Sequence, residues 1–331
     1  DKNDHLQKVL DTHDIKKVEA LDKMVQKKNK VKESLDGKFS DERARLAIDS
    51  GSYAKNTAIN TKFDIDVCAP YLKKTASNES GFEKLEEMYD EVYRYLQFEY
   101  KKQDAQLEEV RKQKVSIGLI FDLDGDKFEM DVVPARERPD HGSYGDSSTK
   151  LSLHINPSRL SDKEKEKGSK KIQTNIKEHI DLLKNKPHER KVVKQLKVWK
   201  LELKDRVGGK LIKSFMMELY AKEAFDECDD DNVPIGMWEK LKMVMQYIVD
   251  NVEDNDLVDP ANSSNIVSDS MSDTAKTTTK RELKKTIKEV EEDSDKIKEY
   301  FPINEKYDEG DETKGNSAYT SPSVLSTSTF G

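Results

Sequence analysis

The sequence predicts an α+β protein of two lobes, with a mixed sheet in the first lobe and helices in the second. Two observations carry this prediction. Before about residue 165, short stretches with strand-like alternation occur in the order strand, helix and strand pair. After about residue 170, the apolar stretches have helical spacing instead. The expected boundaries are residues 1–165 for the mixed lobe with an N-terminal helix, 166–300 for the helical lobe and 301–331 for a flexible tail rich in Ser and Thr.

Each expected element follows from the spacing of its apolar residues. In the first lobe we expect one long helix or two over residues 4–35, a strand leading into a turn over 44–53 and a strand over 62–69. A helix of about thirty residues follows over 82–113, and then two strands over 114–122 and 127–135 joined by the turn sequence Asp-Leu-Asp-Gly-Asp. In the second lobe we expect helices over 172–185, 189–204, 210–225, 237–252 and 274–301.

Composition restricts the classes of function. Only 34% of the residues are hydrophobic and 37% are charged, and no apolar run is long enough to span a membrane. The N-terminal stretch lacks the apolar core of a signal peptide, so a soluble cytoplasmic protein is expected. The net charge of −8 argues against broad affinity for nucleic acid. Cys68 and Cys228 are the only cysteines and are expected to be reduced and structural.

Three aspartates predict a metal site. Asp64 and Asp66 are separated by one residue on a predicted strand, so their side chains point to the same face. Two like charges so close together raise each other's pKa unless a cation lies between them, and a divalent metal is the obvious candidate. Asp131 has the same setting on a later strand, between apolar neighbours. Three such carboxylates can hold two Mg²⁺ ions about 4 Å apart, which is the chemistry of phosphoryl or nucleotidyl transfer.

A Gly-Ser pair precedes these acids at a fixed distance. Gly51 and Ser52 are followed by eleven residues, then by Asp64-Ile65-Asp66, and later by Asp131. This order resembles the DNA polymerase beta-like nucleotidyltransferase superfamily. The resemblance implies that Gly51 and Ser52 begin a turn into a helix that cradles a nucleoside triphosphate. It also implies that Asp64, Asp66 and Asp131 are the catalytic residues and hold two Mg²⁺ ions, with Mn²⁺ as an alternative.

The helical lobe resembles one branch of this superfamily. The segments around Trp199 and Phe215 are similar to a helix pair of the oligoadenylate synthase and cyclic GMP-AMP synthase branch, which includes the bacterial cGAS/DncV-like nucleotidyltransferases of anti-phage defence. The resemblance implies that Lys197 and Ser214 contact the triphosphate and that Phe215 stacks on a base. For Lys197 the structural alternative is a solvated lysine on a helix, and for Phe215 it is core packing. The sequence departs from relatives at 55–57, where Lys-Asn-Thr replaces a frequent Arg-Gly-Thr.

The resemblance implies an enzyme that joins ATP and other NTPs into a cyclic di- or trinucleotide second messenger. One alternative is a template-independent transferase that makes linear oligoadenylate or modifies tRNA, although the acidic charge disfavours tRNA. Another is a catalytically inactive scaffold that binds nucleotide or a protein partner, which the three acids argue against. The bases joined and their linkage are left open.

Two expectations concern partners. No DNA activator is expected, because two isolated cysteines cannot build the zinc-binding insertion of the animal DNA sensor in this branch. The tail ends in Phe-Gly after a flexible run. Some bacterial relatives are joined through a C-terminal Gly or Ala to a target by an enzyme with E1- and E2-like parts. The resemblance therefore implies that Gly331 is conjugated in the same way, while composition alone favours an inert tail.

Overall fold

The computed structural model divides into two compact units, each built from separate parts of the chain. It describes residues 1–61, 63, 65–76, 79–138, 150–160, 165, 168, 171–228 and 232–308. The sheet unit comprises Glu19–Lys55 and the described residues of Asp64–Asp181. The helical unit comprises Asp1–Val18, the described residues of Asn56–Phe63 and those from Leu182 onward. These units are discontinuous, unlike the contiguous boundaries expected at residues 165 and 300.

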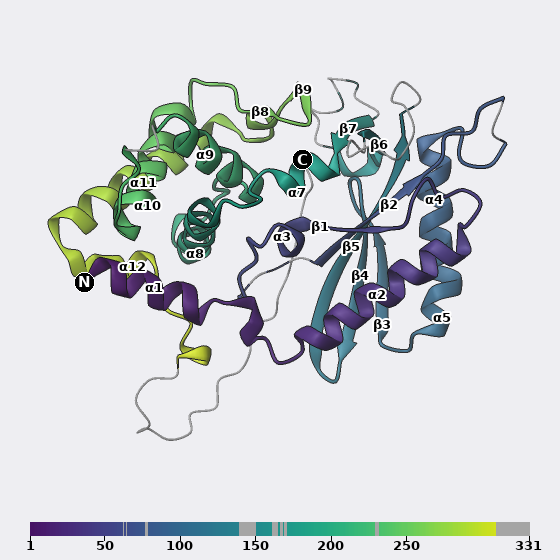
Figure 1. Ribbon diagram of the computed structural model, residues 1–331, viewed down its shortest axis with the longest axis horizontal. Coiled ribbons are helices and arrows are strands. Elements are labelled where there is room, and N and C mark those ends of the chain that lie inside the picture. The colour runs from purple at the N-terminus through teal and green to yellow at the C-terminus, as the bar shows by residue number, and fades with distance from the viewer. Residues whose placement is uncertain are drawn as a thin grey trace. The chain divides into compact units, whose positions relative to one another are not determined.

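The sheet unit is built on a seven-stranded mixed sheet (Figure 1). Its main path runs β1-β2-β5-β4-β3, and β6 and β7 continue from β5. Only the β2–β5 pairing is parallel among the described pairs. The strands are β1 Ile48–Ser50, β2 Ile65–Tyr71, β3 Leu107–Lys112, β4 Ile117–Leu123, β5 Asp126–Glu137, β6 Lys150–His154 and β7 Lys171–Asn175.

Helices α2 and α4 pack against this sheet. The helical elements of the unit are α2 Leu21–Lys38, α3 Gly51–Ala54, α4 Leu85–Tyr95, the π-helical turn η2 Leu96–Tyr100, α5 Lys101–Gln103, the 3-10 turn η3 Pro157–Arg159 and α7 Ile176–Asp181. α4 buries one apolar stripe, formed by Met88, Tyr89, Val92 and Tyr95, as its helical spacing predicts. One part of the core gathers Cys68, Val133, Leu151 and Ile176 from four different elements.

Two predicted helices are wrong in part. The helix expected over 82–113 ends at Gln103, and Leu107–Lys112 is strand β3. β3 has an irregular register beside Leu107, so that Leu107 and Val110, three residues apart as in a helix, are both buried. The helix expected over 172–185 begins only at Ile176, because Lys171–Asn175 pairs with β6 as strand β7.

The helical unit packs around one large apolar core that includes Trp199, Trp238 and Phe301. Its elements are α1 Lys2–Thr12, η1 Ile15–Lys17, α8 Pro187–Val207, α9 Ser214–Asp226, α10 Met237–Asn251, the hairpin β8 Val258–Asp259 and β9 Asn262–Ile266, η5 Val267–Ser270, α11 Asp273–Glu292, η6 Ser294–Lys296, α12 Ile297–Tyr300 and η7 Glu305–Tyr307. α10 contacts α1, α8, α9 and α11. The predicted helical character of this part of the chain is confirmed.

The apolar pattern over residues 4–35 forms two helices that belong to different units, α1 and α2. Leu6 and Val9 of α1 are buried in the core of the helical unit. Both cysteines are free, and burial raises the pKa of the Cys68 thiol to about 12. Among the described helices, none is long and apolar enough to cross a membrane.

Candidate active site

A row of registered residues crosses the sheet unit and carries two of the three predicted acids. Ser50 on β1 lies opposite Asp66 on β2, and Asp66 is the register partner of Asp131 on β5. Asp131 in turn lies opposite Gly118 on β4. Residues paired across neighbouring strands point to the same face of a sheet, so the two carboxylates lie side by side. Each aspartate is only 4% exposed.

The Gly51 turn approaches Asp66 too closely for any side chain at position 51. A Cβ atom there would lie 2.0 Å from Asp66 Oδ2, and the backbone of Gly51 has a φ of +72°. Both the space and the left-handed conformation therefore require glycine. Ser52 follows in α3, a single four-residue turn, and is half-buried. The hydroxyl of Ser50 is buried beside Asp66 and has no hydrogen-bond partner in the described part of the chain.

Asp131 is held by neutral donors from the turn between β3 and β4. Gln113 Nε2 donates to Asp131 Oδ1 at 3.0 Å. The Ser116 hydroxyl lies 3.2 Å from Asp131 Oδ2 and 2.7 Å from Gln113 Oε1, and its single proton can serve one acceptor at a time. Gly118 leaves room for this arrangement, because a Cβ there would lie 2.5 Å from Gln113 Nε2. These contacts fix the orientation of the carboxylate without neutralising its charge.

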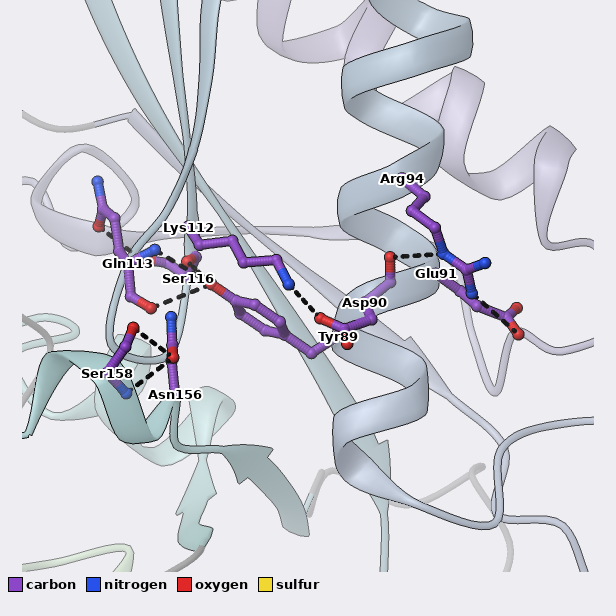
Figure 2. A network of polar contacts seen from close by, with 9 residues as sticks. All are labelled: Tyr89, Asp90, Glu91, Arg94, Lys112, Gln113, Ser116, Asn156 and Ser158. Carbon is purple, nitrogen blue, oxygen red and sulfur yellow. Dashed lines mark hydrogen bonds and ion pairs between the residues drawn. The ribbon is translucent and has the colours of Figure 1, made fainter. Parts of the chain in front are cut away.

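A tyrosine on α4 fixes the turn that supplies these donors (Figure 2). The Tyr89 hydroxyl accepts from the backbone N–H of Gln113 at 3.1 Å. It lies 3.0 Å from the Gln113 carbonyl oxygen and 2.8 Å from that of Ser116, and it donates its one proton to either. Burial raises the pKa of Tyr89, so the hydroxyl stays protonated. An ion pair between Lys112 of β3 and Asp90 of α4 also links this strand to the helix.

The described residues fit a divalent metal in donor chemistry. Mg²⁺ prefers carboxylate oxygens, and Asp66 and Asp131 present two carboxylates on one face beside the uncommitted hydroxyl of Ser50. Asp64, the third predicted ligand, lies outside the described residues. Within the described ranges, no group of three or more His, Cys, Asp or Glu side chains gathers as a metal site. That Asp64 completes a set of three ligands stays a prediction.

Lys197 lies in a buried polar cluster of the helical unit. Its ammonium group donates to the carbonyl oxygen of Thr57 at 2.8 Å and contacts the Thr57 hydroxyl at 3.0 Å. Glu218 Oε1 is 3.8 Å from the ammonium nitrogen and accepts from the Thr57 hydroxyl at 2.9 Å. The exposed fraction of the Lys197 side chain is 8% and that of Glu218 is 1%. The alternative of a solvated helix lysine is therefore wrong.

The other residues predicted in the helical lobe lie on α9. Ser214 is the first residue of that helix and is half-buried. It stands four residues before Glu218, so the two share one face of the helix and Ser214 lies one turn from the Lys197 cluster. Phe215 is partly buried and packs against the helical core, as the structural alternative expected. Its proposed stacking on a base stays a prediction.

The departure at residues 55–57 has a structural explanation. Asn56 has a φ of +56°, in the left-handed region that glycine adopts most easily. Asparagine is among the few other residues that adopt this region readily, so an asparagine is compatible with this turn. The turn is followed by Thr57, whose hydroxyl forms hydrogen bonds with Lys197 and Glu218. Gly331, the predicted conjugation residue, lies outside the described residues.

Sequence reasoning missed the residues that support the predicted ones. Gln113 and Ser116 lie in a stretch read partly as helix, and neither belongs to a motif. Thr57 and Glu218 are 161 positions apart, and no short pattern joins them. Gly118 offers a weak indication, because an isolated glycine in a strand often marks a close approach.

Solved structures share this fold over most of the chain. CdnC of E. coli MS115-1 with ATP matches with a TM-score of 0.64 and 21% identity, covering 90% of this chain and 94% of that one. CdnG, a CD-NTase of Bradyrhizobium diazoefficiens in complex with GTP, matches with a TM-score of 0.65 and 13% identity, covering 91% and 94%. The DncV cyclic AMP-GMP synthase of Vibrio cholerae, in complex with nonhydrolyzable GTP, matches with 0.55 and 15%, covering 77% and 68%.

The E. coli CdnC has also been solved as a complex with HORMA-deltaN, which matches with a TM-score of 0.58 and 22% identity over 86% of this chain and 89% of that one. Neither a family model nor a curated protein matches the sequence. At sequence identities between 13% and 22%, these structural similarities establish the fold of the chain and no more. The chain has the α+β fold of the cGAS/DncV-like nucleotidyltransferases, and the predicted fold class is confirmed.

Proposed function

We propose that this protein is a metal-dependent nucleotidyltransferase that joins ATP and other NTPs into a cyclic di- or trinucleotide and releases pyrophosphate. The observation that carries the proposal is the register of Asp66 with Asp131, two buried carboxylates on adjacent parallel strands. A buried pair of like charges is costly unless a cation joins it. The solved structures of the same fold include proteins with bound ATP or GTP and a named cyclic AMP-GMP synthase.

The roles of the chain's own residues follow from their contacts. Asp66 and Asp131, together with Asp64, would hold Mg²⁺ or Mn²⁺. Bound at such a site, two ions lower the pKa of an attacking ribose hydroxyl and neutralise the triphosphate. Gln113 and Ser116 keep the Asp131 carboxylate in one orientation, so catalysis costs little reorganisation.

The glycine at position 51 lets the Ser50–Ser52 turn approach Asp66 closely. Gly51 and Ser52 of this turn are proposed to contact the triphosphate. Lys197 supplies a compact positive charge suited to polyphosphate. For it to contact a triphosphate, its ammonium group would have to exchange a bond to Thr57 for one to the ligand. Ser214 and Phe215 are proposed to contact the triphosphate and a base.

The decisive experiment is to incubate the full chain with four NTPs and Mg²⁺ and to measure the molecular masses of the products by mass spectrometry. A cyclic product has lost every terminal phosphate, so its mass is distinctive and phosphatase does not change it. Asp66→Asn should abolish the product. Asp124→Asn is a matched control, because Asp124 is exposed in the β4–β5 turn at a φ of +61°, which asparagine also favours. Product formation by Asp66→Asn at the control rate would refute the proposal.

The same experiment separates the alternatives. A ladder of phosphatase-sensitive oligoadenylates would identify a linear synthase, and transfer only to added tRNA would identify a tRNA-type enzyme. Nucleotide binding without product in any metal would favour an inactive scaffold. Reactions with and without double-stranded DNA test the expectation that no DNA activator is needed. A strict requirement for DNA would overturn it.

We propose a cytoplasmic role in anti-phage defence, with a protein partner that controls activity. The complex of CdnC with HORMA-deltaN supports the proposal of a partner, because a protein of the same fold assembles with another component. Conjugation of Gly331 by an E1/E2-like enzyme is the alternative that the tail suggests. Deleting Gly331, or replacing it with Glu, should remove a conjugate from a denaturing gel when the partner is coexpressed. A conjugate that persists unchanged would exclude this route and leave the nucleotidyltransferase proposal intact.

A further inference from the structure

The helical unit contains a group of acidic side chains that takes no part in the site proposed above. A hollow of about 460 Å³ opens between α9, α10 and the segment after α10. We name it the acidic hollow, and its principal lining residues are Tyr220, Glu223, Glu227, Tyr247, Asn251 and Asp256. On α9, Tyr220, Glu223 and Glu227 follow one another at spacings of three and four, so they share one face. Tyr247 and Asn251 share a face of α10 in the same way.

The acids of the hollow are not neutralised by the protein. Asp226, at its edge, pairs with Lys186 at 2.8 Å and with Lys222. Glu223, Glu227 and Asp256 form no ion pair with any residue of the described chain. Tyr247 donates to Glu227 Oε1 at 2.8 Å and lies 3.4 Å from Glu223 Oε2. One phenolic proton thus serves two carboxylates, and net negative charge remains in the hollow.

A buried hydroxyl in the wall of the hollow provides the second observation. Tyr220 is 1% exposed and lines the hollow, yet its hydroxyl has no hydrogen-bond partner among the described residues. Such groups are normally paired, because an unmade hydrogen bond in a buried position costs free energy. The Tyr220 ring also meets that of Tyr247 edge to face, with centroids 6.3 Å apart. The hollow is therefore lined by two aromatic side chains, by carboxylates that form no ion pair within the described chain, and by the residue that carries this unpaired hydroxyl.

These features select the type of cation. A compact metal ion needs converging carboxylates, and the described chain has no group of three or more metal-binding side chains. A guanidinium group spreads its charge over five N–H donors in a plane, which suits separated acceptors and stacks on aromatic rings. From the geometry we infer that the acidic hollow binds the guanidinium of an alkylguanidine, with Glu223, Glu227 and the Tyr220 hydroxyl as its hydrogen-bond acceptors.

The guanidinium has two sources, a free small molecule or an arginine side chain of a partner protein. Titration calorimetry of the full chain at physiological salt distinguishes them, with agmatine as the first probe and acetyl-Gly-Arg-Gly-amide as the second. The same peptide with citrulline in place of arginine is the neutral control. Tighter binding of the arginine peptide than of agmatine identifies a protein partner, and the reverse identifies a small molecule. Binding of the citrulline peptide as tight as that of the arginine peptide would overturn the inference.

Matched variants locate the binding. Glu223→Gln should weaken agmatine binding about tenfold, since hydrogen bonds to charged groups are the stronger class. Glu292→Gln is the control for charge, because Glu292 is an exposed residue of α11 outside the hollow. It should change the affinity less than about twofold. Equal weakening by both variants, or no heat of binding with agmatine at millimolar concentration, would refute the inference.

The variant Tyr220→Phe distinguishes a role of the hydroxyl in ligand binding from a role in stability. Because the Tyr220 hydroxyl makes no hydrogen bond in the described protein, its removal should leave the unfolding temperature unchanged or raise it. Agmatine affinity should nevertheless fall about threefold to tenfold. A lower unfolding temperature with unchanged affinity would mean that the hydroxyl is structural, and the inference would fail.

Discussion

The two acidic sites of the chain are built differently, one on strands and one on helices. In the sheet unit, Asp66 and Asp131 are placed by strand register, nearly excluded from water, and Asp131 is held by Gln113 and Ser116. In the acidic hollow, the carboxylates come from helix faces, lie further into solvent and share one tyrosine proton. Carboxylates that converge rigidly suit a compact ion, whereas separated acceptors beside an aromatic wall suit an extended cation.

The largest expected effect tests the strand-built site directly. Asp131→Asn keeps the volume and the contact with Gln113 but removes the charge. We expect NTP turnover to fall by about a thousandfold or more, because electrostatic preorganisation is usually the largest catalytic contribution. Product mass spectrometry measures the loss, and circular dichroism checks that the fold remains. Turnover within about tenfold of the wild type would contradict a metal site on these strands, since the carboxylate would then hold no catalytic ion.

The next effect concerns the close approach of the turn to Asp66. In Gly51→Ala, the new Cβ would lie 2.0 Å from Asp66 Oδ2, so the carboxylate or the turn must shift. A displacement of that kind can cost about a hundredfold in rate. Gly37→Ala is the matched control, because no atom lies within 4 Å of the added Cβ and the site is inside α2. That control should keep full activity and be slightly more stable.

A smaller effect is expected from the donors that orient Asp131. Gln113→Ala removes one hydrogen bond to the carboxylate and should lower turnover about tenfold to a hundredfold, as for other residues that orient metal ligands. The Mg²⁺ concentration for half-maximal turnover should rise, which distinguishes orientation of a ligand from loss of folding. If Gln113→Ala leaves the Mg²⁺ dependence unchanged, the strand-built site does not depend on its neutral donors.

Lys197 provides a test of charge compensation within the helical unit. Lys197→Met removes a buried ammonium group that lies 3.8 Å from Glu218 Oε1 and should lower the free energy of unfolding by about 3 kcal/mol. Adding Glu218→Gln should restore most of that stability. If Lys197 also binds triphosphate, ATP affinity stays low in the double variant. Recovery of both stability and ATP affinity would show that the lysine is only structural.

The smallest effect concerns the pH dependence of stability that Glu223 causes in the acidic hollow. Burial, with the nearby acids Glu227 and Asp226, raises the pKa of Glu223, so its proton is held more tightly in the folded state than in the unfolded state. Stability therefore falls as pH rises through this pKa. Glu223→Gln should raise the unfolding temperature at pH 7.5 by about 1 to 3 °C. The gain should vanish below the unfolded pKa of 4.5, and a lower unfolding temperature at pH 7.5 would contradict it.

The sequence predicted that Asp66 and Asp131 lie on strands, and the structure confirms this because the determinants are local. Two-residue alternation put Asp66 and Asp131 on polar faces of short strands, and the Gly-Ser pair supplied the turn. Gln113 and Ser116 could not be predicted, because their role depends on the β3–β4 turn, whereas the sequence pattern placed Gln113 at the end of a helix and Ser116 inside a strand. The burial of Lys197 depends on Thr57, a partner 140 positions away that no local pattern reveals. The acidic hollow requires the packing of α9 on α10, which periodicity alone does not give.

The chain leaves the sheet unit after Lys55 and returns at Asp64, and Ile59 in between is buried in the helical core. The excursion lies between the Gly-Ser turn and the Asp-x-Asp strand, so the motif is interrupted by a piece of the other unit. Together with Leu6 and Val9, Ile59 would be lost from any fragment that begins at Leu182. Neither unit therefore corresponds to one continuous segment of the chain, so no single cut of the chain separates one whole unit from the other.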